Sequence, residues 1–146
     1  MLSQEKLAQR ILEVIPLIMR VVGANIRQET SASFRVSHHR VLKLLYQRPR
    51  TISELAACQA VALPTMSRTI STLVERGWVT RTEDTNDRRR VLVQITDEGR
   101  AILDQLHSRI QAHMTARLAP LTAEERELVL AGLEILEKTF TTEELV

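Results

Sequence analysis

Residues 51–77 read TISELAACQAVALPTMSRTISTLVERG, and they contain the signals of two short consecutive helices. Thr51 and Glu54 have the spacing of a capping box, in which the Thr hydroxyl accepts from a first-turn amide and the Glu reaches back to the cap. A short helix therefore begins after Thr51 and runs to about Cys58. A second helix follows a tight turn and ends at Gly77, a predicted left-handed C-cap. Its inward positions are Met66, Ile70, Leu73 and Val74. Two short helices joined by a tight turn predict a helix-turn-helix.

The residue pattern changes directly after this unit. Residues 78–83 and 90–95 are rich in β-branched side chains, and residues 84–89 between them are polar turn formers. They predict a β-hairpin with a basic tip, so the helix-turn-helix carries a wing.

Two helices are predicted before this unit. The first has one apolar face, and Pro16 inside it is expected to kink or briefly break it. That face contains Leu7, Ile11, Val14, Ile15, Ile18, Val22 and Ile26. Ser37 is the predicted N-cap of the second helix, which ends before Pro49.

Two more helices are predicted after the wing. The first opens at residues 96–98, ends near Pro120, and has an apolar face made of Ile102, Leu106, Ile110, Met114 and Leu118. Thr122 and Glu125 form another capping box before the last helix, whose apolar face contains Val129, Leu133, Leu136 and Phe140. A three-helix unit with a wing cannot cover all these faces, so a second subunit is expected to do so.

The predicted fold class is mainly α with a small β-hairpin, a winged helix-turn-helix flanked by N- and C-terminal dimerisation helices. We expect a single domain over residues 1–146. Its winged helix-turn-helix lobe occupies residues 35–99, and the dimerisation helices occupy residues 1–30 and 100–146.

Composition excludes several classes of protein. The chain has 146 residues, 44% of them hydrophobic and 26% charged, as in a soluble domain. Its four glycines are too far apart for a phosphate-binding loop or a nucleophile elbow. The longest uncharged stretch, residues 55–67, is shorter than the ~20 residues that span a bilayer. We expect no membrane association, no catalytic residues, no metal and no cofactor, and therefore no enzyme. With one Cys and no signal peptide, a cytoplasmic protein is expected.

Charge is unevenly distributed along the chain. Residues 35–90 hold 11 Lys or Arg against 5 Asp or Glu, whereas the rest of the chain holds 9 against 13. A basic central segment predicts a module that binds a polyanion.

Several motifs resemble the MarR family of bacterial transcriptional regulators over residues 37–140. The most specific motifs are LVERGWVTR at 73–81, DRR at 87–89 and VQITDEG at 93–99, supported by SELA at 53–56 and TMSR at 65–68. One departure is the turn at residues 59–63, QAVAL, where the family commonly has Gly and a Ser or Thr cap.

DNA contacts are predicted on the second helix of the helix-turn-helix. Helical geometry turns its polar face outward and toward a major groove. This face holds Pro64, Thr65, Arg68, Thr69, Thr72 and Arg76. Arg68 can donate two bonds to guanine, whereas Pro64 offers only apolar contact. The threonines offer hydroxyls to phosphates or bases and methyls to thymine.

The wing supplies the second set of predicted contacts. The resemblance implies that Arg89 enters the minor groove and that Asp87 holds it by a charge-assisted hydrogen bond. Arg88 is a further contact at the tip, while Arg90 is assigned to the strand. Phosphate contacts are predicted for Ser53, Arg50 and Arg81.

The remaining polar side chains have simpler interpretations. Cys58 is read as a buried small hydrophobe, with a redox-sensing Cys58 as the alternative. The pair His38 and His39 is read as ordinary polar surface, with contact to a ligand as the alternative. Asp104 and His107, three residues apart, are also read as polar surface, because two such groups do not make a metal site.

These observations predict a homodimeric, sequence-specific DNA-binding regulator that recognises an inverted-repeat operator in double-stranded DNA. The resemblance implies a repressor released by a small, often anionic aromatic, effector bound in a cleft between the dimer region and the DNA-binding lobe. The alternatives are a constitutive or architectural DNA-binding protein without an effector, and an enzyme or helical scaffold that uses the fold for protein contacts.

Overall fold

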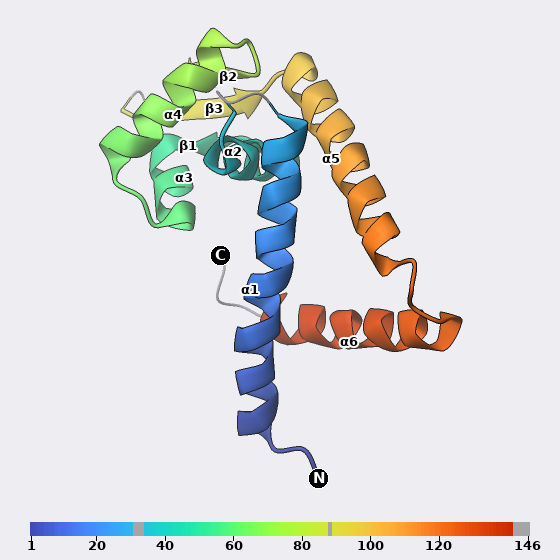
Figure 1. The fold of residues 1–146 in the computed structure, drawn as a ribbon. Helices are drawn as coiled ribbons and strands as arrows, with labels where there is room; N and C mark the ends of the chain where they lie inside the picture. The colour runs from blue at the N-terminus through green and yellow to red at the C-terminus, as the bar shows by residue number, and fades with distance from the viewer. Residues whose placement is uncertain (31–33, 88, 142–146) are drawn as a thin grey trace. The chain divides into compact units, whose positions relative to one another are not determined.

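The structure, a computed structural model, describes residues 1–30, 34–87 and 89–141. Figure 1 shows its helices and its small sheet. The elements, in chain order, are α1 (Gln4–Glu29), α2 (Val36–Gln47), β1 (Arg50–Thr51), α3 (Ile52–Gln59), α4 (Leu63–Glu75), β2 (Val79–Glu83), β3 (Val91–Ile95), α5 (Asp97–Leu118) and α6 (Ala123–Thr141). Two compact units are present, Met1–Ala112 and His113–Val146.

The helix-turn-helix, α3 and α4, forms as predicted. The hydroxyl of Thr51 accepts a hydrogen bond from the Glu54 amide at 3.1 Å. The Glu54 carboxylate, however, lies 3.4 Å from Arg48 Nη1. Pro64 occupies the first turn of α4, where its missing amide would have no helical partner. Gly77 has a φ of 76°, which confirms the left-handed cap.

The turn between α3 and α4 contains a strained residue. Ala60 caps α3 with φ 51° and ψ 44°, a left-handed conformation that crowds the Cβ of an L-residue. The N-cap of the next helix, α4, is Ala62, which supplies no side-chain hydrogen bond. The departure of residues 59–63 from the family pattern therefore has a structural cost in this turn.

Helices α2, α3 and α4 and the sheet bury the core of the first unit. Its fully buried side chains include Val41, Leu42, Leu45, Leu55, Met66, Ile70, Leu73, Val79 and Val93. The prediction for Val74 was wrong, because this side chain is 37% exposed. The buried face of α4, which packs against the core, is formed by residues 66, 70 and 73.

The wing hairpin is confirmed and is joined by a third strand. The sheet order is β1-β3-β2, and both pairings are antiparallel. Val79 pairs with Ile95 at the base of the hairpin, and Glu83 pairs with Val91 toward its tip. The two-residue strand β1, absent from the sequence prediction, pairs Arg50 with Val93.

The structure contradicts the predicted break at Pro16 and the predicted start of the second helix. Helix α1 runs through Pro16 without a break. Pro16 and Leu12 are both exposed, so water can reach the carbonyl that proline leaves without a donor. Helix α2 begins at Val36 rather than after Ser37, because Nδ1 of His38 accepts the Arg35 amide at 3.1 Å.

Thr96, directly before α5, connects three elements. The Thr96 hydroxyl donates to the Gly77 carbonyl at 2.7 Å and accepts from the Gly99 amide at 3.0 Å. The Thr96 amide donates to the Trp78 carbonyl at 2.9 Å. The buried face of α5 is Gly99, Leu103, Leu106 and Ile110. The predicted face was thus correct at residues 106 and 110, while Ile102 and Met114 are half-buried and Leu118 is exposed.

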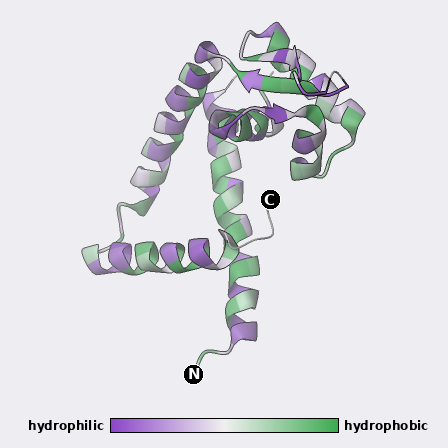
Figure 2. Ribbon diagram, turned by 180° about the vertical axis from the view of Figure 1, so that it is seen from behind, coloured by the Kyte–Doolittle hydropathy of each residue, from purple (hydrophilic) through white to green (hydrophobic). Residues whose placement is uncertain are grey.

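Helix α6, in the second unit, has the predicted capping box but no buried residue. The Glu125 amide donates to the Thr122 hydroxyl at 3.1 Å, and the Thr122 amide donates to the Glu125 carboxylate at 2.9 Å. Hydrophobic residues recur along α1 and along α6 (Figure 2). Large exposed apolar side chains are Leu7, Leu12, Ile15, Leu17, Ile18 and Met19 on α1, and Leu128, Val129, Leu130, Leu133, Ile135 and Phe140 on α6.

Candidate nucleic-acid interface

The outer face of α4 carries the polar side chains that the sequence predicted. Pro64, Thr65 and Arg68 are exposed, and Thr69 and Thr72 are half-buried. Each half-buried threonine donates its hydroxyl to the carbonyl four residues earlier, Thr69 to Thr65 at 3.1 Å and Thr72 to Arg68 at 3.2 Å. Arg68 is thus the long exposed cation of this face.

Arg76, the C-cap of α4, makes a contact within the lobe, and its predicted contact with DNA stays a prediction. Its guanidinium lies over the Trp78 ring, 5.1 Å from the ring centroid. Trp78 also contacts Phe34, with ring centroids 5.5 Å apart. Arg76 therefore packs against the aromatic cluster at the base of the wing.

Hydrogen bonds along the backbone shape the wing tip. The Asp87 carboxylate accepts from the Arg89 amide at 3.0 Å, and the Arg90 amide donates to the Asp87 carbonyl at 3.0 Å. Asp87 thus supports Arg89 through its backbone, which corrects the predicted bond to the guanidinium. Arg89 is exposed, and Arg90 lies just before β3 rather than in it. Arg88 lies outside the described residues.

Arg81 ties the wing to the recognition helix α4. Its Nη2 atom donates to the Ser71 hydroxyl at 2.6 Å and to the Ser67 carbonyl at 3.2 Å. No pattern in the sequence pointed to this contact, because its partners are 10 and 14 residues away on another element. The wing and α4 are therefore held as one unit.

Arg50 and Ser53, the other two residues predicted to contact phosphate, differ in how far their side chains are already engaged within the protein. Arg50 donates from Nε to the Leu44 carbonyl at 3.2 Å and from Nη2 to the Gln47 amide oxygen at 3.0 Å. Its guanidinium is thereby engaged at the end of α2. Ser53 is exposed in the first turn of α3, so it can reach a phosphate beside that helix.

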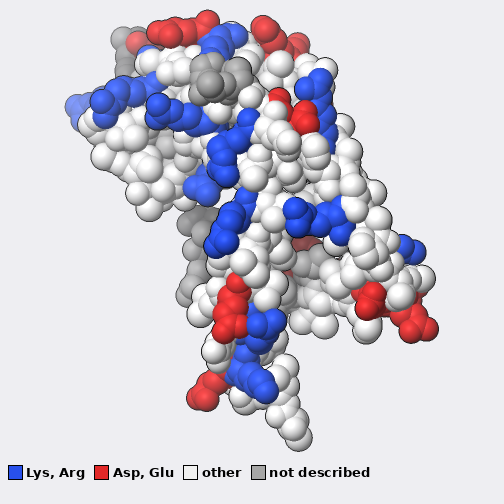
Figure 3. Space-filling view, in the orientation of Figure 1, with Lys and Arg blue, Asp and Glu red and all other residues white. Residues whose placement is uncertain are grey.

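Charge gathers on the same part of the first unit. Figure 3 shows Lys and Arg side chains collected over α4 and the wing. The basic bias of residues 35–90 in the sequence thus corresponds to a basic surface around the predicted reading elements. Such a surface attracts a polyanion before any specific contact forms.

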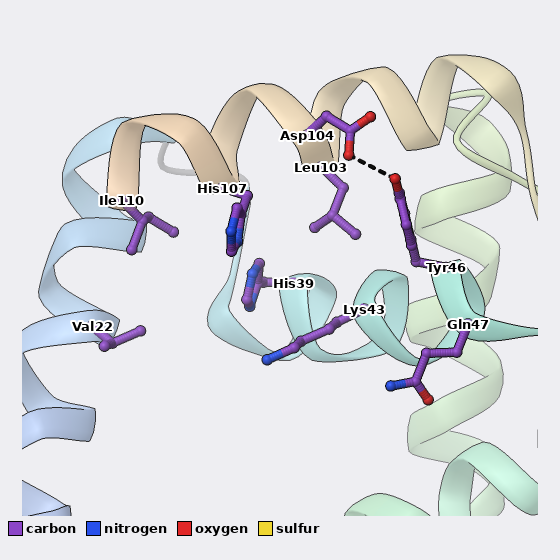
Figure 4. Close-up of a pocket in the computed structure, with 9 residues that line it drawn as sticks. All are labelled: Val22, His39, Lys43, Tyr46, Gln47, Leu103, Asp104, His107 and Ile110. Carbon is purple, nitrogen blue, oxygen red and sulfur yellow. Dashed lines mark hydrogen bonds between the residues drawn. The ribbon is translucent and has the colours of Figure 1, made fainter. Parts of the chain in front are cut away.

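A second candidate site is a cavity of about 500 Å³ within the first unit, lined by residues of α1, α2 and α5 (Figure 4). The lining residues are Val22, His39, Lys43, Tyr46, Gln47, Leu103, Asp104, His107 and Ile110. His39 and His107 face each other from α2 and α5 (Figure 4). Burial lowers the pKa of His39, and the charges of Lys43, His107 and Arg40 lower it further.

One wall of this cavity is a hydrogen-bonded link between α2 and α5. The Tyr46 hydroxyl donates to the Asp104 carboxylate at 2.9 Å. This bond and the charge of Asp104 raise the pKa of Tyr46. Arg100 lies over the Tyr46 ring at 4.8 Å. Asp104 and His107, which the sequence analysis read as polar surface, therefore both line this cavity.

Two further interpretations need correction. His38 is buried rather than ordinary polar surface; its ring lies 5.7 Å from Phe34, and burial lowers its pKa. Cys58, predicted to be buried, is exposed, because α3 directs Leu55 and Ala56 to the core and leaves residue 58 outside.

Two absences follow for the part of the chain that the structure describes. No group of three His, Cys, Asp or Glu side chains there is arranged to hold a metal ion. None of the helices within residues 1–30, 34–87 and 89–141 is long and apolar enough to cross a bilayer.

Comparison with known proteins agrees with this geometry. The MarR family model matches residues 34–90. The multiple antibiotic resistance protein MarR of Salmonella typhimurium is 37% identical over 86 residues, which cover 58% of this chain and 57% of that protein. The chain therefore spans little more than half the length of the curated relatives it matches. An uncharacterized HTH-type transcriptional regulator of Bacillus subtilis, YwaE, is 33% identical over 84 residues, covering 58% of this chain and 47% of that protein.

Solved structures extend the likeness to nearly the whole chain. Wild-type MarR from E. coli, in its apo form, matches with a TM-score of 0.70 and 27% identity, covering 95% of this chain and 96% of that one. A mutant MarR from E. coli complexed with operator DNA matches with a TM-score of 0.62 and 26% identity, covering 94% and 98%. The fold is that of the winged-helix regulators. The chain is therefore similar to the MarR family in sequence over residues 34–90 and in fold over nearly its whole length.

Proposed function

We propose that this chain is a homodimeric, sequence-specific DNA-binding transcriptional regulator that acts in the cytoplasm as a repressor. The observation that carries the proposal is the pairing, in one lobe, of an exposed Arg68 on α4 with an exposed Arg89 on the wing. The Arg81 contacts hold these two elements together. The mutant MarR with operator DNA, a relative of similar fold, supports the same use of the lobe.

Each arginine has its own task in this proposal. Arg68 enters the major groove, where a planar guanidinium can donate two bonds to guanine O6 and N7. Arg89 enters the minor groove, whose negative potential is strongest where A·T pairs narrow it. Pro64 and Thr65 contact the edges of the same site, Ser53 and Arg88 contact phosphates, and Asp87 keeps the tip in shape.

The test compares Arg68→Ala with Arg89→Ala on duplexes that the wild type selects from random DNA. Losing Arg68 should relax one position in each half-site and cost ~1 to 3 kcal/mol against the preferred base. Losing Arg89 should weaken binding most at A·T-rich flanks and reduce the slope of log affinity against log salt by about two for a dimer. Arg40→Ala, an equal charge change at an exposed position of α2, is the control. Wild-type binding by both variants would refute the proposal.

Dimerisation is proposed through residues 1–30 and 100–146. The exposed apolar side chains of α1 and of α6 support it, because monomeric proteins rarely leave such large apolar faces in water. Light scattering should give about twice 16.6 kDa, and DNA footprints should show inverted half-sites centred ~10 base pairs apart. A stable monomer, or a footprint over a single half-site, would contradict the dimer.

The cavity between α1, α2 and α5 is the proposed effector site. Lys43, His39 and His107 can donate to an anion, while Val22 and Leu103 provide apolar contact. This chemistry suits a small anionic aromatic molecule. A ligand that prefers one arrangement of the helices shifts the population toward it, and such coupling usually changes affinity by about 5- to 150-fold.

Thermal-shift screening of aromatic carboxylates, followed by operator titration, tests the effector. Binding that weakens with Lys43→Gln and lowers operator affinity is expected. Ligands that bind without changing operator affinity would favour the constitutive DNA-binding alternative. The redox alternative predicts that peroxide lowers operator affinity in the wild type but not in Cys58→Ser.

A further inference from the structure

The hydroxyl protons of Thr69 and Thr72 are already in use. Each hydroxyl lies within hydrogen-bond distance of the carbonyl four residues earlier, 3.1 Å for Thr69 and 3.2 Å for Thr72. A carbonyl oxygen can only accept, so the hydroxyl must be the donor. Thr65 differs, because its hydroxyl makes no such bond among the described residues and its side chain is exposed.

This leaves two features of each side chain for DNA: the lone pairs of the oxygen and the methyl group. Phosphate oxygens, guanine O6 and N7 are all acceptors, so they find no proton at Thr69 or Thr72 unless the backbone bond breaks. Groups that fit are the amino groups of adenine and cytosine, which donate, and the thymine methyl, which is apolar.

Only an A·T pair presents both an amino donor and a methyl group on its major-groove edge. We propose that Thr69 and Thr72 select A·T base pairs in the operator half-site. The methyl of each threonine contacts the thymine methyl, and its oxygen accepts from the adenine amino group. This inference rests on the proposed entry of α4 into the major groove.

The positions of Arg68, Thr69 and Thr72 on α4 are consistent with one arginine that contacts guanine and two threonines that contact A·T pairs. Residues 65, 68, 69 and 72 lie on one stripe of the helix, because residues three and four apart are neighbours. Arg68 and Thr72 are one turn apart, about 6 Å along the helix axis at 1.5 Å per residue. The arginine therefore reads guanine while the threonines read A·T pairs near it.

The competing role is a threonine that donates to phosphate, and two substitutions separate the roles. Valine keeps the methyl and the shape but has no hydroxyl, whereas serine keeps the hydroxyl and loses the methyl. For a phosphate donor, Thr→Val weakens binding to every sequence equally. For a methyl reader, Thr→Ser removes the preference for thymine and Thr→Val retains it.

The experiment uses the full chain and duplexes selected by the wild type from random DNA. Each thymine of the half-site is replaced in turn by deoxyuridine, which pairs in the same way but lacks the methyl. One lost methyl contact should weaken wild-type binding about fourfold per half-site. Thr69→Ser or Thr72→Ser should abolish the response at one thymine each, and the matching valine variants should keep it.

Thr80→Ser, the same substitution at an exposed position of β2 to which no DNA contact is assigned, is the control and should leave every deoxyuridine response unchanged. Circular dichroism and light scattering establish that the variants fold and associate like the wild type. The proposal is overturned if no deoxyuridine substitution weakens wild-type binding, or if both serine variants respond like the wild type. A wild type that selects no duplex at all would instead refute the proposed function, and this inference with it.

Discussion

Replacing Ala60 with glycine is expected to stabilise the protein. Ala60 is left-handed, with φ 51° and ψ 44°, and its amide donates to the Ala57 carbonyl at 3.2 Å. An L-residue with a Cβ pays ~1 to 2 kcal/mol in this conformation. Glycine removes that strain but adds ~0.4 to 1 kcal/mol of chain freedom to the unfolded state. The net gain in the free energy of unfolding should be about 0.5 to 1 kcal/mol.

Urea unfolding at one fixed protomer concentration measures this change, because the stability of a dimer depends on concentration. Ala57→Gly is the matched control, since Ala57 is exposed and helical in the same short helix. It should lose ~0.5 to 1 kcal/mol. The two substitutions add the same residue three positions apart and should therefore shift the urea midpoint in opposite directions. Equal losses in both variants would refute a left-handed Ala60.

Three further predictions concern packing, pH and the wing. Gly99→Ala should cost ~1 to 3 kcal/mol in urea unfolding, because its Cβ would lie 2.3 Å from the Trp78 carbonyl oxygen; an unchanged midpoint would contradict this contact. Burial lowers the pKa of His38 and His39 below the usual 6.5. Below about pH 6.5 the unfolded chain therefore binds more protons than the folded chain, so the free energy of unfolding falls as the pH falls and reaches its full value only above that pH. The urea midpoint should fall between pH 7.5 and pH 5.5, and it should fall less in His39→Gln. An equal fall in the wild type and the variant would contradict a contribution of His39. Arg81→Ala should lower operator affinity about tenfold and speed amide hydrogen exchange in β2. Weaker binding to DNA with unchanged amide exchange would contradict the role of Arg81 in holding the wing to α4.

Local signals in the sequence predicted most of the elements. Pro64 and Gly77 mark the start and the end of α4 because each has a backbone preference that acts without distant partners. The capping box at Thr122 is equally local, since its two hydrogen bonds join residues three apart. The order of helices and the wing follow from such signals, and so does the fold class.

Features that depend on contacts between distant residues were missed. Strand β1 is only two residues long and exists because β3 offers a free edge to Arg50 and Thr51. The start of α2 depends on an imidazole that accepts a backbone amide, a use of His38 that no common capping pattern includes. The sequence could not show that Asp104 faces Tyr46, 58 positions away.

The candidate interface was predicted to the level of residue faces but not of hydrogen bonds. Helical spacing placed Thr69 on the outer face, yet it could not indicate that the Thr69 hydroxyl bonds to the backbone. The basic wing was similarly evident, while the use of Arg81 inside the lobe was not. Side-chain donors have several partners within reach, and the choice among them is made by packing.

The three hydrogen bonds at Thr96 connect the end of α4, the start of β2 and the start of α5 directly. Its hydroxyl and amide join the Gly77 carbonyl after α4, the Trp78 carbonyl before β2 and the Gly99 amide in the first turn of α5. No flexible linker separates α5 from the wing, so α5 cannot change direction without changing bonds at the hinge of the wing. The proposed effector cavity, which α5 lines, and the proposed DNA-reading surface on α4 and the wing are therefore connected through the bonds of this one residue.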